Sequence, residues 1–163
     1  MIALRAPAGQ NAGVLADRPP PHILDDRIRI LADAWASDPS IGAVYLFGSR
    51  ASGRPGPRSD VDLAVTLAAG LDARARWRKR LDLMADASRR LGTDAVDVVV
   101  LEDAPIVLGH RVLARGRLLR EPQPRRRAAV AEDILRRYLD EEPLRRLLDA
   151  GLACRIREGR FAG

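Results

Sequence analysis

The sequence predicts an α/β protein, with a small mixed sheet of three to five strands that is backed by helices and followed by C-terminal helices. Short apolar runs at 41–47, 60–67 and 95–101 have the length and composition of buried strands. Helical patterns precede the first run, at 23–37, and separate the second from the third, at 72–91. This order of strands and helices predicts the fold class.

Length and composition predict one domain with a helical appendage. The chain has 163 residues, 47% of them hydrophobic, which is enough for a substantial core. Residues 1–21 show no regular pattern and end in consecutive prolines, so we expect a disordered leader there. Residues 22–121 form the predicted core. Residues 122–163 form a C-terminal helical segment, packed on the core or on a partner.

The first two helices are predicted from apolar spacing and from residues that start and stop helices. The first begins at Ile23 and ends before Pro39, because proline disfavours helix in the residue before it. The second has Asp72 as its N-cap and Gly92 as its C-terminal stop. Its buried stripe is predicted at Trp77, Leu81, Met84 and Leu91. The arginines of its other face are expected to be mainly solvated.

Further elements follow the third strand. Asp103 is expected to cap a helix that ends near Gly116, and residues 117–120 form a short strand. Residues 125–157 are predicted to be helical. Positive charge at a helix N-terminus opposes the helix dipole. We therefore expect the basic run at 125–127 either to have a partner or to lie in solution, outside the helix, and we favour the second.

Charge and composition exclude several classes of protein. The net charge of +6 favours polyanionic partners without choosing among them. A single cysteine, Cys154, allows no internal disulfide, and no Cys/His cluster indicates zinc. No apolar run approaches the roughly 20 residues that span a bilayer. We expect a cytoplasmic protein with no membrane partner. Direct nucleic-acid binding is not favoured, since no helix-turn-helix or stacking aromatic residues are visible.

The segment 48–65 carries the first chemical signal. The pair Gly48-Ser49 follows the first strand, and a loop rich in Gly, Pro and Arg leads to Asp60-Val61-Asp62 at the start of the second. Alternate residues of a strand point to the same face, so Asp60 and Asp62 lie side by side. Two neighbouring carboxylates repel each other unless a cation lies between them. The pattern therefore predicts a cation site.

Asp97 is the one polar residue of the third strand. A carboxylate in an apolar strand is costly unless it is paired, solvated or bound to a metal. Asp97 could face water on an edge strand, but with an Asp-x-Asp pair on another strand we predict a three-carboxylate site. Magnesium prefers oxygen ligands and usually also binds substrate phosphates. Asp60, Asp62 and Asp97 would hold two ions on a triphosphate, and Asp97 would accept the proton of the acceptor.

The Gly-Ser pair fits the phosphates of a nucleotide. Glycine allows a close approach of the backbone, and the Ser49 amide and hydroxyl can donate to the β- and γ-phosphates. One of Arg50, Arg54 and Arg58 on the following loop is expected to screen phosphate charge.

The motifs Leu46-Phe47-Gly48-Ser49 and Ser59-Asp60-Val61-Asp62-Leu63 resemble those of the DNA polymerase β-type nucleotidyltransferase superfamily. Within it, the chain is similar to the minimal nucleotidyltransferase (MNT) proteins. The resemblance implies a nucleotidyltransferase core at 22–121 and ATP as substrate. It implies magnesium ligands at Asp60, Asp62 and Asp97, and nucleotide-binding residues at Gly48, Ser49 and Ser59.

The same resemblance implies an antitoxin in a hetero-oligomer with a HEPN-domain ribonuclease toxin. Such antitoxins transfer AMP from ATP to a tyrosine hydroxyl of the toxin, which silences it. Two alternatives stay open. The site could adenylylate a small hydroxylated molecule such as an aminoglycoside, although such enzymes usually carry a larger second domain. The C-terminal helices could instead neutralise a partner by masking it, without catalysis.

Overall fold

The computed structural model describes residues 19–56 and 59–157, so residues 1–18 of the expected leader lie outside the described residues. A four-stranded mixed sheet with the order β3-β2-β1-β4 forms its centre, as the sequence predicts. β1 is antiparallel to β2 and β4, and β2 is parallel to β3. The strands are β1 (Ile41–Phe47), β2 (Val61–Leu67), β3 (Val96–Val100) and β4 (Arg117–Arg120).

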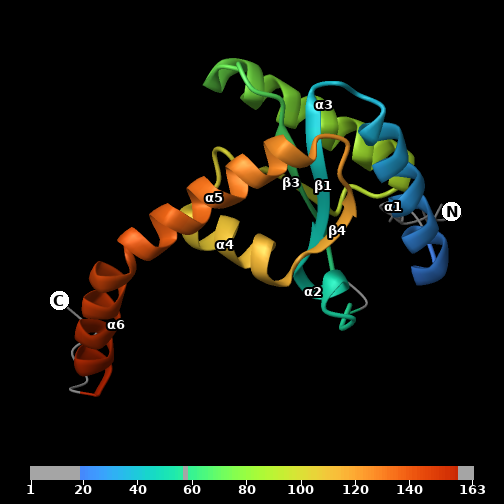
Figure 1. Cartoon of the computed structure of the whole chain (residues 1–163). Coiled ribbons are helices and arrows are strands. Elements are labelled where there is room, and N and C mark those ends of the chain that lie inside the picture. Colours follow the sequence, from blue (N-terminus) through green and yellow to red (C-terminus); the bar gives the residue numbers. More distant parts are fainter. Residues whose placement is uncertain (1–18, 57–58, 158–163) are drawn as a thin grey trace, which may run out of the picture.

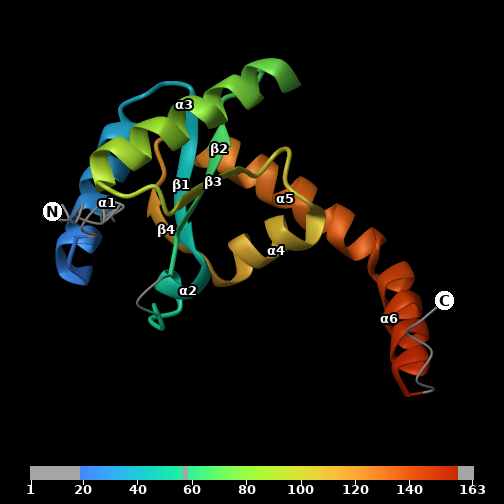
Figure 2. The same cartoon turned by 180° about the vertical axis from the view of Figure 1, so that it is seen from behind.

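Helices cover both faces of this sheet (Figure 1). One face packs against α1 (Pro21–Ala36) and α3 (Ala73–Leu91). The other packs against α4 (Ile106–Arg115) and α5 (Pro124–Asp140). The short α2 (Gly48–Ala51) lies between β1 and β2. The last helix, α6 (Glu142–Arg157), extends away from the sheet beyond the end of α5 (Figures 1 and 2).

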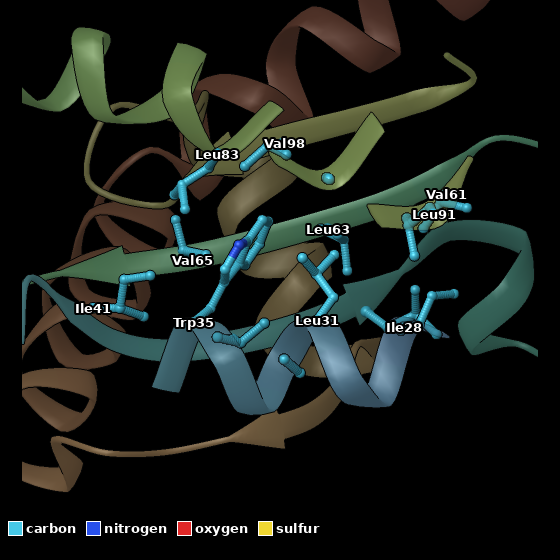
Figure 3. Close-up of a cluster of buried hydrophobic side chains, with 14 of the residues drawn as sticks. Ile28, Leu31, Trp35, Ile41, Val61, Leu63, Val65, Leu83, Leu91 and Val98 are labelled. Atoms are coloured by element: carbon cyan, nitrogen blue, oxygen red, sulfur yellow. The ribbon is translucent and has the colours of Figure 1, made fainter. Parts of the chain in front are cut away.

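Strand alternation divides the core into two layers. Leu63 and Val65 of β2 point to the face covered by α1 and α3, where Leu31 and Trp35 of α1 meet them (Figure 3). Ala64 of β2 points to the α4/α5 face. Odd-numbered residues of β2 therefore build the main core, and the even-numbered Asp62 belongs to the opposite face.

The predicted buried stripe of α3 is wrong in its first half. Trp77 and Leu81 are 54% and 45% exposed, and the buried positions are Leu83, Ala87 and Leu91. The predicted and the observed buried positions both follow helical spacing, so spacing alone does not show which of the two sets is buried. Trp77 instead lines a cavity together with residues of β3 and of the loop after it. Asp72 does cap α3, by accepting a hydrogen bond from the Ala75 amide at 2.7 Å.

The basic run before α5 is also placed differently from the expectation. Residues 125–127 lie in the first turn of α5, not outside it. Arg126 donates to the Leu67 carbonyl at 2.7 Å and to Glu102 Oε1 at 2.9 Å, while Arg127 pairs with Glu121. Glu102 also accepts from the Leu67 amide at 2.8 Å. The two carboxylates offset the positive charge at the helix N-terminus. The hydrogen bonds of Arg126 and Glu102 to Leu67 hold α5 against the end of β2.

Asp103 does not cap a helix. The helix α4 begins at Ile106, with Pro105 before it and no side-chain cap. Asp103 instead accepts hydrogen bonds from Arg76 of α3, at 2.6 Å from Nη2. Among the helices that the structure describes, none is long and apolar enough to cross a membrane.

Candidate active site

Asp62 and Asp97 lie directly beside each other at the start of two parallel strands. The β2–β3 ladder pairs Asp62 with Asp97, Val61 with Val96 and Leu63 with Val98. Because paired residues of neighbouring strands point to the same face, both carboxylates lie on the α4/α5 face of the sheet. The sequence predicts Asp97 on a strand next to the Asp-x-Asp pair, and this is its position.

Asp60 completes a cluster of negative charge. It precedes β2 and is exposed. Burial is the main cause that raises the pKa of Asp62 above its usual 3.8, and the charges of Asp60 and Asp97 raise it further. The three carboxylates therefore act on one another electrostatically, and a cation between them would relieve the repulsion.

Gly48 lies against the Asp62 carboxylate. Its φ is +71°, a left-handed conformation that favours glycine. A Cβ added to Gly48 would stand 2.0 Å from Asp62 Oδ2 and 2.9 Å from its Cγ. Only a residue without a side chain fits here while Asp62 keeps its position. The Gly-Ser pair therefore lies directly beside the Asp62 carboxylate, with Ser49 in the short helix α2.

Ser59 and the loop arginines have structural contacts. The Ser59 hydroxyl oxygen accepts a hydrogen bond from the Gly56 amide at 2.7 Å and so shapes the loop before Asp60. The Arg50 side chain is only 6% exposed and lies 3.6 Å from Asp25 of α1. Arg54 is exposed, and Arg58 lies outside the described residues. Among the described arginines of this loop, only Arg54 is exposed to solvent.

Arg80 of α3 also contacts the candidate site, and the sequence does not predict it there. Its Nη2 lies 3.2 Å from Asp97 Oδ1, and its Nε donates to the Val98 carbonyl at 2.6 Å. β3 is an edge strand and the Asp97 side chain is 49% exposed, so the alternative of a solvated edge carboxylate is partly right. No local pattern in the sequence distinguishes Arg80 from the other arginines of α3, because its partners Asp97 and Val98 lie on another element.

The carboxylates are suited to magnesium but are not gathered around a metal position. Over residues 19–56 and 59–157, no group of three or more His, Cys, Asp or Glu side chains is close enough together to hold a metal ion. The donor set itself, Asp60, Asp62 and Asp97, supplies the oxygen ligands that magnesium prefers. Burial is the main cause of the raised pKa of Asp62, and the charges of Asp60 and Asp97, which raise it further, are the part that a bound cation would offset.

The chain is similar to proteins of toxin–antitoxin systems. It is 37% identical over 92 residues to protein adenylyltransferase MntA of Shewanella oneidensis, an alignment covering 56% of this chain and 60% of that protein. A chain in a crystal structure of a toxin–antitoxin with AMP-PNP superposes with a TM-score of 0.61, at 29% identity over 79% of this chain and 98% of that chain. A second such chain belongs to a complex of tri-AMPylated Shewanella oneidensis HEPN toxin with MNT antitoxin. Its TM-score is 0.57, at 26% identity over 81% of this chain and 98% of that chain.

A family match covers the site itself. Residues 31–125, more than half of the chain, match the family described as Polymerase beta, Nucleotidyltransferase. This span contains Gly48, Ser49, Asp60, Asp62 and Asp97, which the structure places around the start of β2. The chain therefore belongs to the polymerase β nucleotidyltransferase family.

Proposed function

We propose that the chain is a magnesium-dependent antitoxin that transfers AMP from ATP to a tyrosine hydroxyl of a cognate HEPN-domain toxin. The observation that carries the proposal is the pairing of Asp62 with Asp97 beside Gly48, in a chain of the nucleotidyltransferase family. The relatives support the acceptor, because they include a protein adenylyltransferase and an MNT antitoxin in complex with AMPylated HEPN toxin. A cytoplasmic location follows from the proposal, because ATP and the RNA that the toxin cleaves are found there.

The proposed reaction is an in-line displacement at the α-phosphorus of ATP. The tyrosine oxygen forms a bond to this phosphorus, and the bond from phosphorus to the oxygen bridging to the β-phosphate breaks. Pyrophosphate leaves with the bonding electrons, and the tyrosine proton passes to Asp97. Gly48 and Ser49 hold the β- and γ-phosphates with backbone and hydroxyl donors. Two magnesium ions, held by Asp60, Asp62 and Asp97, would neutralise phosphate charge and lower the pKa of the attacking hydroxyl.

Label transfer tests this proposal directly. A candidate cognate HEPN-domain toxin is incubated with the purified chain, magnesium and ATP labelled at the α-phosphate. We expect label on a toxin tyrosine, and none when magnesium is removed with a chelator. ATP labelled at the γ-phosphate is the control and should leave the toxin unlabelled. Absence of α-label from the toxin would contradict the proposal.

The arrangement of the described C-terminal helices favours a protein acceptor over a small-molecule acceptor. α5 packs on the sheet through Val130 and Ile134, and α6 contacts the rest of the described chain chiefly at its junction with α5. The described residues thus form no second domain that would enclose a small hydroxylated molecule. The 122–163 segment accordingly has two parts in our proposal: α5 belongs to the core, and α6 faces the partner.

The surface of α6 supports a role in partner binding. Its large apolar side chains are 44–69% exposed, and most of them follow an i, i+4 spacing along one side of the helix. They are Leu144, Leu147, Leu148, Leu152 and Ile156. An amphipathic helix that leaves such a stripe uncovered is typical of a protein interface. We propose that this apolar stripe of α6 contacts the toxin.

Replacing Leu148 with glutamate is expected to weaken toxin binding by at least tenfold, because the new charge would be desolvated in the interface (about 1.4 kcal/mol per factor of ten). Isothermal titration calorimetry with the toxin measures this affinity. Ala150→Glu is the matched control, since it places the same charge on an exposed position on the side of α6 opposite Leu148. Equal affinities of the two variants would show that the stripe is not the interface.

A further inference from the structure

A cavity of about 430 Å³ lies beside Asp97, at the free edge of β3. α3 contributes Trp77 and Arg80 to its walls, β3 contributes Asp97 and Val99, and α4 contributes Leu108. The volume is in the range of pockets that bind small molecules or single side chains. One of the three carboxylates of the candidate active site is therefore also part of the cavity wall.

The sheet order places this cavity opposite the Gly-Ser pair. Gly48 follows β1, Asp62 lies on the neighbouring β2, and Asp97 lies on the outer strand β3. The carboxylates thus stand between the Gly-Ser pair and the cavity. In an in-line displacement the nucleophile approaches opposite the leaving group. If Gly48 and Ser49 hold the leaving pyrophosphate, the attacking hydroxyl must arrive from the β3 side, where the cavity opens.

The walls of the cavity are suited to an aromatic ring. Trp77 is 54% exposed, although it is one of only two tryptophans in the chain, and the other, Trp35, is 4% exposed in the core. Val99 and Leu108 add apolar surface. An aromatic side chain inserted here would bury this surface and could stack on the indole. Large exposed apolar groups beside a reactive site commonly mark a binding surface.

Ion pairs hold the polar part of the wall in place. The Arg80 guanidinium lies 5.5 Å from the centre of the Trp77 ring, in a cation–π arrangement. The same group donates to the Val98 carbonyl at 2.6 Å and pairs with Asp97 at 3.2 Å. Arg80 thus connects the indole to the carboxylate through fixed contacts. The cavity is already shaped before any acceptor binds.

We infer that this cavity is the acceptor subsite, and that it receives the side chain of the tyrosine to be modified. The phenol ring packs between Trp77 and the apolar floor formed by Val99 and Leu108, which brings its hydroxyl to Asp97. This inference rests on the proposed function and adds the residues that select the acceptor. Trp77 is a specificity residue in this scheme, and Arg80 is a positioning residue.

Steady-state kinetics of AMP transfer to the toxin tests the inference. We expect Trp77→Ala to raise the KM for the toxin at least tenfold and to leave the KM for ATP within twofold. Trp77→Phe, which keeps an aromatic ring, should recover most of the loss. Leu81→Ala is the matched control, because Leu81 is an exposed apolar residue one turn later on α3 and is not part of the cavity wall. If Trp77→Ala raises the KM for ATP instead, the cavity binds the adenine base. If neither KM changes, the cavity takes no part in substrate binding. Either result overturns the inference.

A binding measurement separates this inference from the proposed function. Acrylamide quenches the fluorescence of exposed tryptophan, so it reaches Trp77 but not the buried Trp35. In the presence of AMP-PNP, we expect the toxin to protect Trp77 from quenching. AMP-PNP alone should give no protection. The fluorescence of toxin alone is subtracted as the blank. If the toxin is labelled but Trp77 stays quenchable, the acceptor subsite is wrong and the proposed function stands. If no label is transferred, the proposed function fails, and continued quenching of Trp77 would then reject the subsite as well.

Discussion

Replacing Asp62 with asparagine is expected to reduce AMP transfer by at least about 10²–10³-fold, the loss typical of removing one preorganised electrostatic group from an active site. Asp62 stands between Asp60 and Asp97 and against Gly48, so it is the central member of the cluster. Asparagine keeps the shape of the side chain but removes the negative charge that would bind magnesium. Label transfer from ATP to the toxin measures the loss. Asp82→Asn, an exposed carboxylate on α3, is the control and should keep full activity.

The same variant separates modification from masking. If antitoxin action requires AMP transfer, cells that produce the toxin with the Asp62→Asn chain stop growing. If the chain acts by covering the toxin, the variant protects them as well as the wild type does. Protection by Asp62→Asn together with loss of protection by Leu148→Glu would favour masking through α6. Calorimetry with the toxin confirms that Asp62→Asn still forms the complex and measures how far Leu148→Glu weakens it.

The folded state of Asp62→Asn is expected to be at least as stable as that of the wild type without magnesium. Burial, together with Asp60 and Asp97, raises the pKa of Asp62 above its usual 3.8. A raised folded-state pKa contributes stability that is present below the unfolded-state pKa and is lost as the pH rises through the folded-state value. The wild type should therefore lose free energy of unfolding relative to the variant as the pH rises above 3.8. Urea unfolding at several pH values measures the difference, and parallel curves would contradict it.

With magnesium present, the wild type should become more stable than Asp62→Asn. An ion that binds only the folded state stabilises it in proportion to the logarithm of its concentration above the dissociation constant. Magnesium is therefore expected to raise the melting temperature of the wild type and to raise that of Asp62→Asn much less. This measurement does not depend on catalysis. It tests the metal site even if the acceptor has been misassigned.

The sequence predicts the residues proposed to bind ATP and magnesium better than those proposed to bind the acceptor tyrosine. The position of Asp97 beside Asp62 follows from local signals: a Val-rich strand, one charge within it, and an Asp-x-Asp pair on another strand. The role of Arg80 and Trp77 does not follow from local signals. Two stripes of α3 have helical spacing, and only packing against the sheet selects Leu83, Ala87 and Leu91 as the buried one. Trp77 then turns to the β3 edge, and no pattern along the chain reports that rotation.

Long-range partners limit the prediction in the same way. Arg126 belongs to a basic run whose charge opposes the helix dipole, so the sequence favours a solvated position. Its partners are Glu102, from the turn after β3, and the Leu67 carbonyl at the end of β2. Neither is near Arg126 in the sequence. The position of α5 on the sheet, and hence the direction in which α6 leaves it, depends on these contacts.

Gly48→Ala is expected to remove AMP transfer nearly as completely as Asp62→Asn, although it changes no charge. The new methyl group would stand 2.0 Å from Asp62 Oδ2, so either the carboxylate or the turn that carries Ser49 must move. Displacing a reacting group by about 1 Å can cost about 10²-fold in rate. The alanine must also adopt the left-handed conformation, at a cost of about 1–2 kcal/mol. Label transfer and urea unfolding are measured on the same preparation.

Gly53→Ala separates the two effects of the Gly48 substitution. Gly53 lies just after α2, in the same connection between β1 and β2, with φ of +70°, almost equal to the +71° of Gly48, and a Cβ added there meets no atom within 4 Å. Both variants should therefore lose a similar amount of stability from backbone strain, but only Gly48→Ala should lose activity. Equal losses of activity would mean that strain in the loop, and not contact with Asp62, explains the need for glycine. A normal rate for Gly48→Ala would mean that Asp62 can work from another position, and that the close packing of Gly48 against it is not required for catalysis.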